Sequence, residues 1–528
     1  MRKLRSTLCA VALTAVLVVA GAATASAAVQ VAPNNTPAAA FAPAQTCNCH
    51  SNFIEQWQQS MHAQALSDPI FKVKLAEGNA ATGGAVGPFC IKCHGPVATM
   101  VGQVGNADPK SAAAQGVGCS FCHQAVGTTA PARNVSLLIE PSGVYRAQIS
   151  TPQAPHPVGY SPFHATSEIC GSCHNVSHPG NGLPLETTYS EWQASPQAKA
   201  GVQCQGCHMT KAPGAIGPSM GWAAGGAPLR PIYQMTFTGA QVGLGNATFA
   251  QQMLKSAAVI KIDAPPILDQ SKTASATITV TNVGAGHSLP TGLTEIREMW
   301  LSVTMTGPDG KEIELGRHQY GTVLKDAAGK YPADLWTATG IQSDDRIPPM
   351  GSSVSAFKIA FPSGVQYGTL KAKLLYRSVP EVLAKKAAAP NPTTVMVEEE
   401  QMVFANLAGR QQYNKTILAE AATSPLMPLV MAVFGILLCV GIVIFFVVWG
   451  RRSSKPRPPK PTKSSSGDAD TEAEDGPSNA EDDTSDTDEQ TTDGAEQSAA
   501  SSWSQAGPIG GDDASGATKA DGGEADAR

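Results

Sequence analysis

The sequence contains no basic stripe and no recognition motif of the kind that nucleic-acid-binding proteins carry, and its formal net charge is −5. Nucleic-acid binding is therefore not expected. The C-terminal end is almost without large apolar residues: between Ser464 and Arg528 there are 18 acidic residues, 2 basic residues and one aromatic residue, Trp503. Such a segment cannot bury enough apolar surface to fold, and the sequence predicts a disordered tail there.

Charged residues are absent from residues 426–449, a run of 24 residues that is long enough to cross a bilayer as a helix. Six basic residues follow between Arg451 and Lys463. Because basic residues beside a membrane span stay on the cytoplasmic side, we expect a single-pass protein of the cell membrane. Its N-terminal bulk would lie outside, and residues 450–528 would form a cytoplasmic tail, first basic and then acidic.

Residues 1–28 have the pattern of a secretory signal peptide. Basic residues (Arg2, Lys3 and Arg5) precede an apolar run from Leu8 to Ala23, and small residues follow at Ala25-Ser26-Ala27. This order of basic, apolar and small residues favours a cleaved signal over an uncleaved anchor. Residues 29–45 are rich in Pro, Ala and Asn, and we interpret them as a linker.

Cysteine occurs twelve times, and ten of these cysteines lie in five short runs that end in Cys-His. Four runs are C-x-x-C-H, the attachment signal of c-type haem, in which two thiols bind the porphyrin and the histidine ligates iron. The first run, Cys47-Asn-Cys49-His50, is one residue short. The sequence thus predicts five covalent haems c, four of them at regular motifs. The attachment residues are Cys47, Cys49, Cys90, Cys93, Cys119, Cys122, Cys170, Cys173, Cys204 and Cys207, and the proximal ligands are His50, His94, His123, His174 and His208.

Other uses of paired cysteines explain this pattern less well. A zinc ribbon has no reason to place histidine directly after every second cysteine. A disulfide scaffold would suit an exported chain but leaves the five histidines unexplained. A thioredoxin-like motif is normally single and lies in a βαβ unit, which this region lacks.

The haem motifs fall within residues 46–255, which we expect to form an α-helical and irregular multihaem domain with a helical stretch at 52–65. About 42 residues per motif are too few for an ordinary protein core, so the porphyrins themselves should form it. In residues 256–405 the pattern changes to alternation of apolar and polar residues. This alternation predicts an all-β, Ig-like sandwich, with strands at 276–282, 299–305, 354–361 and 370–376. Residues 406–425 would form a helical or flexible neck.

Two segments of the haem region echo each other. Ile54-Glu-Gln-Trp-Gln-Gln-Ser60 follows the first motif, and Tyr189-Ser-Glu-Trp-Gln-Ala-Ser195 follows the fourth. Each echo is followed by another haem motif, which indicates duplication of a two-haem unit. Where His62 lies two residues after Ser60, Gln197 lies two residues after Ser195. The equivalent ligand is thus missing, and one haem must take a remote ligand or stay five-coordinate.

On these residues the chain resembles multihaem cytochromes c of the cytochrome c-552/c-554 type, which are related to the tetrahaem electron acceptor of hydroxylamine oxidoreductase. The likeness spans roughly residues 46 to 380. It is carried by Cys49-His50 with Trp57, Ser60 and His62, by Gly118-Cys-Ser-Phe-Cys-His123, by His164 before the fourth motif, by Glu191-Trp192 before Cys204-Gln-Gly-Cys-His-Met209, and by Asn282-Val-Gly-Ala-Gly-His-Ser-Leu-Pro-Thr-Gly292.

Six histidines remain as candidates for the distal side of the irons. His62 is favoured by its place after the Trp57 helix, and the resemblance also points to His164 and His287 as distal ligands. His156 and His178 are left open, and His318 is expected to be structural. Met209 and Met220 are alternatives that would raise the potential, although methionines more often serve packing.

Electron transfer is the expected function: a membrane-anchored, outward-facing pentahaem cytochrome would pass electrons between a membrane donor and an external acceptor. Partners would be a quinol-oxidising complex or a reductase. The alternative is a reductase or oxidase of a small nitrogen or sulfur compound at a five-coordinate haem, which we place at the haem whose distal ligand the duplication does not supply. No C-x-x-C-K variant and no obvious cluster of Arg, His and Tyr favours that alternative. A scaffold role for the β-sandwich leaves the haem motifs unexplained.

Overall fold

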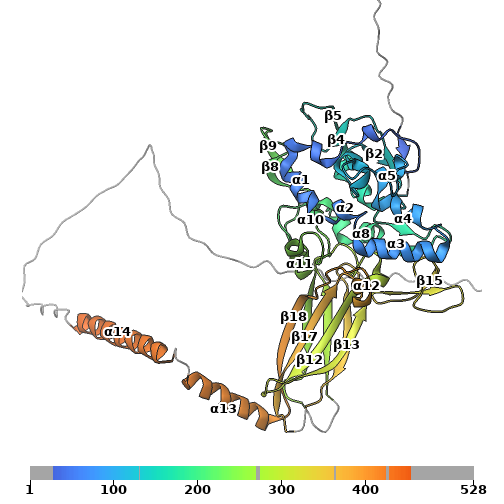
Figure 1. The fold of residues 1–528 in the computed structure, drawn as a ribbon. Helices are drawn as coiled ribbons and strands as arrows, with labels where there is room; N and C mark the ends of the chain where they lie inside the picture. The colour runs from blue at the N-terminus through green and yellow to red at the C-terminus, as the bar shows by residue number, and fades with distance from the viewer. Residues whose placement is uncertain (1–27, 130, 269–273, 362–363, 424–426, 454–528) are drawn as a thin grey trace, which may run out of the picture. The chain divides into compact units, whose positions relative to one another are not determined.

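The structure is a computed structural model that describes residues 28–129, 131–268, 274–361, 364–423 and 427–453 (Figure 1). The chain divides into two compact units, residues 1–436 and residues 437–528. Apart from residue 28, the predicted signal peptide lies outside the described residues, and so does the predicted tail beyond residue 453.

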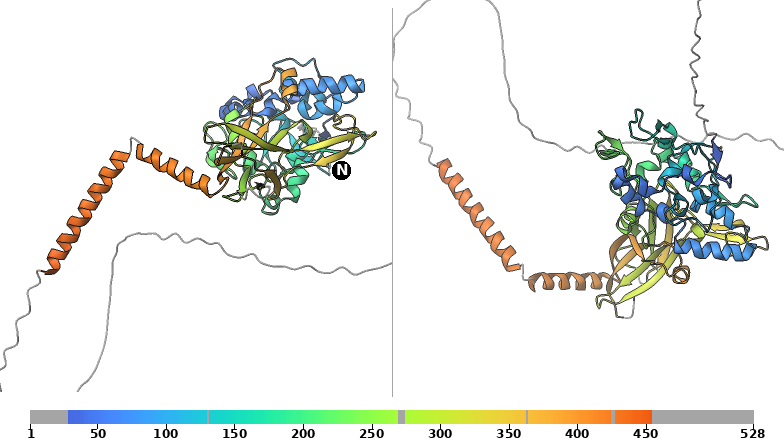
Figure 2. Two further views of the ribbon diagram at one scale, coloured as in Figure 1. Left: turned by 90° about the horizontal axis from the view of Figure 1, so that it is seen from below. Right: turned by 45° about the horizontal axis from the view of Figure 1, so that its top comes forward.

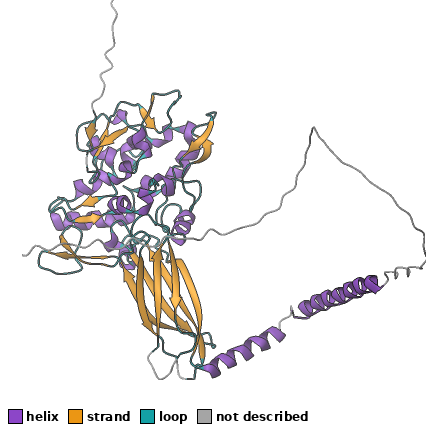
Figure 3. Ribbon diagram, turned by 180° about the vertical axis from the view of Figure 1, so that it is seen from behind, coloured by secondary structure: helices purple, strands orange, loops and turns teal. Residues whose placement is uncertain are grey.

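Short helices dominate the part of the chain before residue 256, as Figure 3 shows. They are α1 (Ser51–Gln58), α2 (Met61–Gln64), α3 (Pro69–Thr82), α4 (Gly87–His94), α5 (Pro96–Met100), α6 (Cys119–Cys122), α7 (Glu168–Gly171), α8 (Thr188–Ala194), α9 (Pro196–Lys199), α10 (Gln205–His208) and α11 (Ala247–Lys255), with 3-10 turns η1 (Ala38–Ala40), η2 (Ala44–Thr46), η3 (Asn48–His50), η4 (Ala112–Ala114) and η5 (Pro162–Ala165).

Small sheets of two or three strands connect these helices. β1 (Val29–Gln30), β3 (Leu137–Ile139) and β2 (Ala125–Thr128) form one sheet in that order. The other strands pair two by two: β4 (Tyr145–Ala147) with β5 (Val158–Tyr160), β6 (Val176–Ser177) with β7 (Pro184–Glu186), and β8 (Ser219–Trp222) with β9 (Leu229–Ile232).

The segment 29–45, interpreted above as a linker, is packed against the haem region. Val29 pairs with Ile139 in the first sheet, and Val31 and Phe41 are buried. The few large apolar residues of this Pro/Ala-rich stretch complete a small hydrophobic cluster with residues of α5, α6 and β3. The packing of these isolated side chains therefore corrects the interpretation from composition.

The helix predicted over 52–65 is divided into α1 and α2. Ser60, between them, has an extended backbone with φ −94° and ψ 158°, and its hydroxyl donates to the carbonyl oxygen of Trp57 at 2.7 Å. The buried Trp57 ring holds this corner in place, because its Nε1–H donates to the carbonyl oxygen of Val117 at 2.8 Å. The corner turns α2, and with it His62, away from the direction of α1.

Apolar side chains supply little of the interior in the second half of the haem region. The buried members of the hydrophobic cluster described above lie between Val31 and Ile139, and the partly buried Phe163, Ile169 and Cys173 pack against them. Within residues 140–241, all of which the structure describes, only Tyr189 and Ile232 are buried apolar residues. Two of the five Cys-His runs lie in this stretch, so its interior must depend on something other than side chains.

The C-terminal part of the first unit is rich in β-strands, as the alternation predicted. One antiparallel sheet has the order β10 (Ala258–Asp263), β11 (Ser275–Asn282), β16 (Ser352–Lys358), and a second has the order β13 (Glu312–Tyr320), β12 (Glu298–Thr306), β17 (Tyr367–Arg377), β18 (Thr394–Phe404). Buried residues of both sheets belong to one hydrophobic core, including Ile278, Leu301 and Leu374. A hairpin of β14 (Thr322–Asp326) and β15 (Ala338–Asp344), the turn η6 (Thr294–Ile296) and helix α12 (Glu381–Lys386) complete this part.

Helix α3 of the haem region lies beside this β-rich part (Figure 2). The Lys74 ammonium lies 4.7 Å from the ring centroid of Trp336, which is in the loop between β14 and β15. Glu77, one turn later, accepts a bond from Lys386 of α12 at 2.6 Å. These contacts fix the two parts against each other over a second area besides the site described below.

Two helices end the described chain, α13 (Leu407–Thr423) and α14 (Met427–Ser453). The first of them covers most of the segment predicted as a neck. Over the residues that the structure describes, no helix combines the length and the apolar character that a membrane span requires.

Candidate haem-binding sites

Each of the five Cys-His runs lies on a short helical turn. The first is on η3, the second ends α4, the third begins with α6, the fourth overlaps α7, and the fifth ends α10. In a helical turn, residues three apart lie on the same face. The two cysteines of a C-x-x-C run are therefore presented together, with the histidine directly after them at the end of the turn.

Four of the five motif histidines face a second histidine. The ring centroids are 6.2 Å apart for His50 and His156, 6.2 Å for His62 and His174, 5.8 Å for His123 and His164, and 6.2 Å for His208 and His287. Two imidazoles on opposite sides of one metal, each with a bond of about 2 Å, place their ring centres roughly 6 Å apart. The observed separations match two axial imidazoles on one iron.

Of the two histidines that the sequence left open, the structure brings only His156 to a motif. His178 instead has its Nε2 atom 3.4 Å from the carbonyl oxygen of Trp336, and its Nδ1 atom accepts from the backbone N–H of Gly180 at 3.1 Å. His318, expected to be structural, lies on β13 with its ring 4.8 Å from that of Tyr320.

The ring of His94 stacks on a phenyl ring and does not face a histidine. The Phe71 ring lies parallel to it, with the centroids 3.7 Å apart and an angle of 4° between the planes. All eleven histidines are among the described residues, and none of them is paired with His94 as the other four motif histidines are paired. The motif without an opposing histidine is therefore the second one.

This finding bears on where an open iron would lie. From the sequence, the haem left without a ligand by the change from His62 to Gln197 was expected either to take a remote ligand or to stay five-coordinate. In the structure Gln197 lies against Gly286, where a Cβ atom would be 3.3 Å from the Cβ of Gln197. The neighbouring His287 faces His208, so a histidine from the β-rich part lies opposite the fifth motif.

Hydrogen bonds to the ring nitrogens fix the orientation of the motif histidines. The Nδ1 atoms of four of them bond backbone carbonyl oxygens: His50 to Ala223 at 2.5 Å, His94 to Ala65 at 2.8 Å, His123 to Arg146 at 2.7 Å and His208 to Thr238 at 2.5 Å. A bond from Nδ1–H leaves Nε2 with its lone pair free for a metal. His174 differs, because its Nδ1 bonds the carboxylate of Glu186 at 3.1 Å.

His164 has the opposite orientation. Its Nε2 atom bonds the carbonyl oxygen of Cys122 at 2.9 Å, while its Nδ1 atom is buried without a hydrogen-bond partner. A buried polar atom without a partner is costly and needs an explanation. The free atom is on the ring that faces His123, so Nδ1 is the atom that is available to a metal there.

Burial keeps several of these imidazoles neutral, which is the form that ligates metals. Burial, followed by the neighbouring His174 and His94, lowers the pKa of His62 to about 3. Burial and then His123 lower the pKa of His164 to about 4. Burial also lowers the pKa of His208 to about 4, against a smaller opposite effect of its bond to Thr238.

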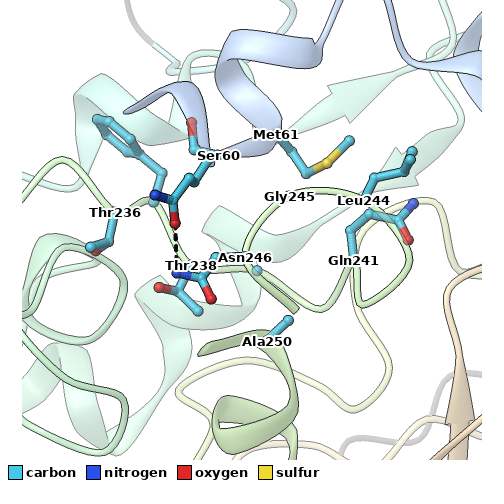
Figure 4. Close-up of a pocket in the computed structure, with 12 residues that line it drawn as sticks. Ser60, Met61, Thr236, Thr238, Gln241, Leu244, Gly245, Asn246 and Ala250 are labelled. Atoms are coloured by element: carbon cyan, nitrogen blue, oxygen red, sulfur yellow. Dashed lines mark hydrogen bonds between the residues drawn. The ribbon is translucent and has the colours of Figure 1, made fainter. Parts of the chain in front are cut away.

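The loop that contains Thr238 bonds the Nδ1 atom of His208 through a backbone carbonyl. A pocket beside this loop is lined in part by the α1–α2 corner (Figure 4). The amide of Asn246 donates to Gln59 Oε1 at 3.2 Å across it. Phe237 in the loop has a positive φ of 42°. That conformation is unusual outside glycine. The two adjacent residues contact two different histidines: the Phe237 ring lies 4.5 Å from the His62 ring, and the carbonyl oxygen of Thr238 bonds the Nδ1 atom of His208.

The loop that carries His287 is tied to the haem region by one carboxylate. Glu191 on α8 accepts from the backbone N–H of Ser288 at 3.0 Å and from the hydroxyl of Thr291 at 2.9 Å, and it also accepts from the guanidinium of Arg346. The sequence singled out Glu191 and the 282–292 loop separately, and the structure joins them. Nothing in the sequence around Arg346 marked it as a member of this group.

Replacing Glu191 with alanine should weaken this connection. Burial raises the pKa of Glu191, but the charge of Arg346 and three hydrogen bonds outweigh it, so the pKa lies below its usual value. Its contribution to stability is thus present above the ordinary carboxyl pKa of about 4.3 and is lost as the pH falls through the lower folded-state pKa. We expect E191A to lower the free energy of unfolding by about 2 kcal/mol at pH 7 and to flatten its acid dependence.

Urea unfolding curves recorded between pH 3 and pH 7 measure this effect. E398A is the matched control, because Glu398 is a half-exposed acid whose oxygen lies 3.9 Å from the Lys373 ammonium. Equal acid dependence in E191A and the unchanged protein would contradict the assignment.

The donor atoms suit haem c. The cysteines in the described residues are free thiols, and in the described chain no three metal-binding side chains gather into one cluster. What the structure offers is pairs of facing imidazoles next to pairs of thiols, together with a buried ring nitrogen on His164 that lacks a partner. A porphyrin iron needs two axial donors and its ring needs two thiols. The residues therefore fit the group.

Residues 46–124 match the family model of cytochrome c554 and c-prime. Among solved structures, the chain is similar to a penta-haem cytochrome c552 from Thermochromatium tepidum, with 21% identity, a TM-score of 0.54, and coverage of 69% of this chain and 99% of that one. A CARDB domain from Pyrococcus furiosus has 11% identity, covers 28% of this chain and 86% of that one, and has a TM-score of 0.16, too low to carry an argument. No curated protein matches. The comparisons support a multihaem cytochrome c with a cytochrome-like N-terminal region and a β-rich C-terminal part.

Proposed function

We propose that this protein is a membrane-anchored, outward-facing pentahaem cytochrome c that transfers electrons between a donor at the membrane and an external acceptor. The observation that carries the proposal is the set of four facing histidine pairs, each beside a pair of cysteines. Histidines on both sides of an iron leave no position for a substrate, which favours a carrier over an enzyme.

The residues that would hold the haems are the ten motif cysteines and nine histidines. Haem c, when bound, supplies a one-electron iron couple, and ligation by two histidines keeps its potential low relative to ligation by methionine. The chain's own contribution is to orient each imidazole through its second ring nitrogen. It also ties the His287 loop to α8 through Glu191.

The short run Cys47–His50 is included among the five. His50 faces His156 at the same separation as the regular pairs, and its Nδ1 atom bonds a backbone carbonyl as theirs do. This similarity supports a fifth haem despite the missing residue between the cysteines.

Membrane attachment rests on the uncharged run of residues 426–449 and the six basic residues after it. In α14 the side chains of Phe434, Leu437 and Phe445 are among many apolar side chains that are exposed. An exposed apolar helix surface is stable in lipid rather than in water. A signal peptide at the N-terminus would direct the haem region outwards, where a quinol-oxidising complex or a reductase is the partner we propose.

A second function, reduction or oxidation of a small nitrogen or sulfur compound, is favoured by one observation. His94 lacks the opposing histidine that the other motif histidines have, so an iron there would keep one axial position open. Such a reaction would also need an acid or base next to that position.

Haem content and spin state test the proposal. We expect five haems per chain in the pyridine haemochrome assay of the full-length protein. Low-temperature EPR should show four low-spin haems and one high-spin haem, with no catalytic turnover of nitrite or hydroxylamine. Replacing Cys47 and Cys49 with serine should reduce the count to four. A high-spin haem that turns over either compound would replace the carrier by the enzyme, and a count of four in the unchanged protein would remove the Cys47–His50 site.

A further inference from the structure

One motif histidine differs from the other four in what its outer ring nitrogen contacts. The Nδ1 atoms of His50, His94, His123 and His208 bond neutral backbone carbonyls, whereas that of His174 lies 3.1 Å from Glu186 Oε1. The same carboxylate oxygen accepts from the Thr188 hydroxyl at 3.4 Å. His174 alone therefore has a charged acceptor.

The position of Glu186 is built by the backbone. Glu186 ends β7 and is paired with Val176 of β6, two residues after His174. The hairpin thus returns the chain so that the carboxylate meets the imidazole. The Glu186 side chain is 14% exposed, whereas the His174 side chain is 51% exposed, so the carboxylate itself is largely shielded from water.

A carboxylate acceptor changes the electronic character of a metal-bound imidazole. It draws the Nδ1 proton towards itself, which makes the ring a more basic ligand. A more basic and more negative ligand stabilises the more highly charged ferric iron over ferrous iron and so lowers the potential. A neutral carbonyl has a smaller effect of the same kind. Second-shell hydrogen bonding is one of the means by which a protein sets haem potentials.

We propose that Glu186 is a positioning residue that makes the haem held by Cys170 and Cys173, between His174 and His62, the one of lowest potential among the bis-histidine haems. The inference rests on the proposed function. It implies that this haem gives up its electron first when the chain is oxidised and accepts one last when the chain is reduced.

The test is a spectroelectrochemical titration of the full-length haem protein carrying E186Q. Glutamine keeps the shape and an acceptor oxygen but removes the charge. We expect the lowest-potential low-spin component to move to higher potential, with its reduced-to-oxidised ratio rising about tenfold at the original midpoint. For a one-electron couple that ratio corresponds to about 59 mV. The other bis-histidine components should keep their midpoints.

E168Q is the matched control. Glu168 is an exposed acid two residues before Cys170, and its side chain has no recorded bond to a histidine. The E168Q substitution removes one negative charge near the same motif and leaves the hydrogen bond of His174 in place. A shift of the midpoint potential that occurs only in E186Q is therefore due to that hydrogen bond. H62A identifies the component, because the haem that becomes high-spin in H62A must be the one that moves in E186Q.

An unchanged midpoint in E186Q, or an equal shift in E168Q, would overturn the inference. If E186Q does not take up its haems, E186D is titrated in its place. E186D retains the charge on a shorter side chain. If its lowest midpoint potential and its EPR signal are both unchanged, the hydrogen bond does not have the proposed role. Failure of the proposed function is distinguished in the unchanged protein, which would then contain no haem or would turn over nitrite or hydroxylamine.

Discussion

Replacing Cys170, Cys173, Cys204 and Cys207 with serine is expected to unfold residues 140–241 while the β-rich part stays folded. In this segment only Tyr189 and Ile232 are buried apolar residues, whereas the hydrophobic core of the β-rich part joins two whole sheets. A segment of about one hundred residues needs a far larger apolar interior to offset its conformational entropy. Without two of its porphyrins the segment would retain, among its haem contacts, only those of His156 and His164 with the first and third motifs.

Limited proteolysis with trypsin measures this loss. Arg146 is a suitable reporter, because its side chain is held by the Glu140 carboxylate at 2.8 Å and by the Val144 carbonyl oxygen at 3.1 Å. We expect cleavage after Arg146 at least tenfold faster in the four-serine variant, with the fragment from about residue 258 onwards resistant. C439S, which removes the exposed cysteine of α14, serves as the control and should leave the pattern unchanged. Equal protection of Arg146 in both variants would show that side chains alone hold the segment together.

Replacing His287 with alanine is expected to convert one low-spin haem completely to high-spin. His287 is the histidine that faces His208. Its loop is held by a bond to Glu191, and this bond brings no other iron-ligating side chain into the place of His287. The lost ligand also removes a connection between the haem region and the β-rich part, so this variant should unfold at lower urea concentration.

EPR and magnetic circular dichroism of the purified protein quantify the change. H318A is the matched control, since His318 is a histidine of the same β-rich part that packs on Tyr320 and faces no motif. An unchanged low-spin signal in H287A would refute the assignment of His287. A high-spin signal in H318A would mean that the change reports general loosening of the β-rich part.

The sequence predicted the attachment side of each site because that side is local. The two cysteines and the proximal histidine lie within five residues, and helical geometry brings them together without help from the rest of the fold. The four predicted strand segments were also found, as β11, β12, β16 and β17, because a half-buried strand shows its period of two directly.

The distal side is not local, and there the sequence was less informative. His156 and His178 both lie in Gly/Pro-containing loops, and only tertiary packing brings the first to His50 and the second to Trp336. The echo between Ser60 and Ser195 predicted that no ligand is supplied at Gln197, which lies against Gly286 in the structure. It did not reveal that His62 faces His174, in the other copy of the repeat, or that the unpaired motif histidine is His94.

His62, in the first copy of the predicted duplication, faces His174 in the second copy. If the facing histidines are iron ligands, the first copy would complete a site in the second through His62, and the β-rich part would complete another through His287. We therefore do not expect the chain to divide into self-sufficient modules. As the chain emerges N-terminus first, the histidine at position 62 must wait for more than one hundred later residues before its counterpart arrives. Under the proposed function, haem attachment and final coordination would thus be separate events in the maturation of this protein.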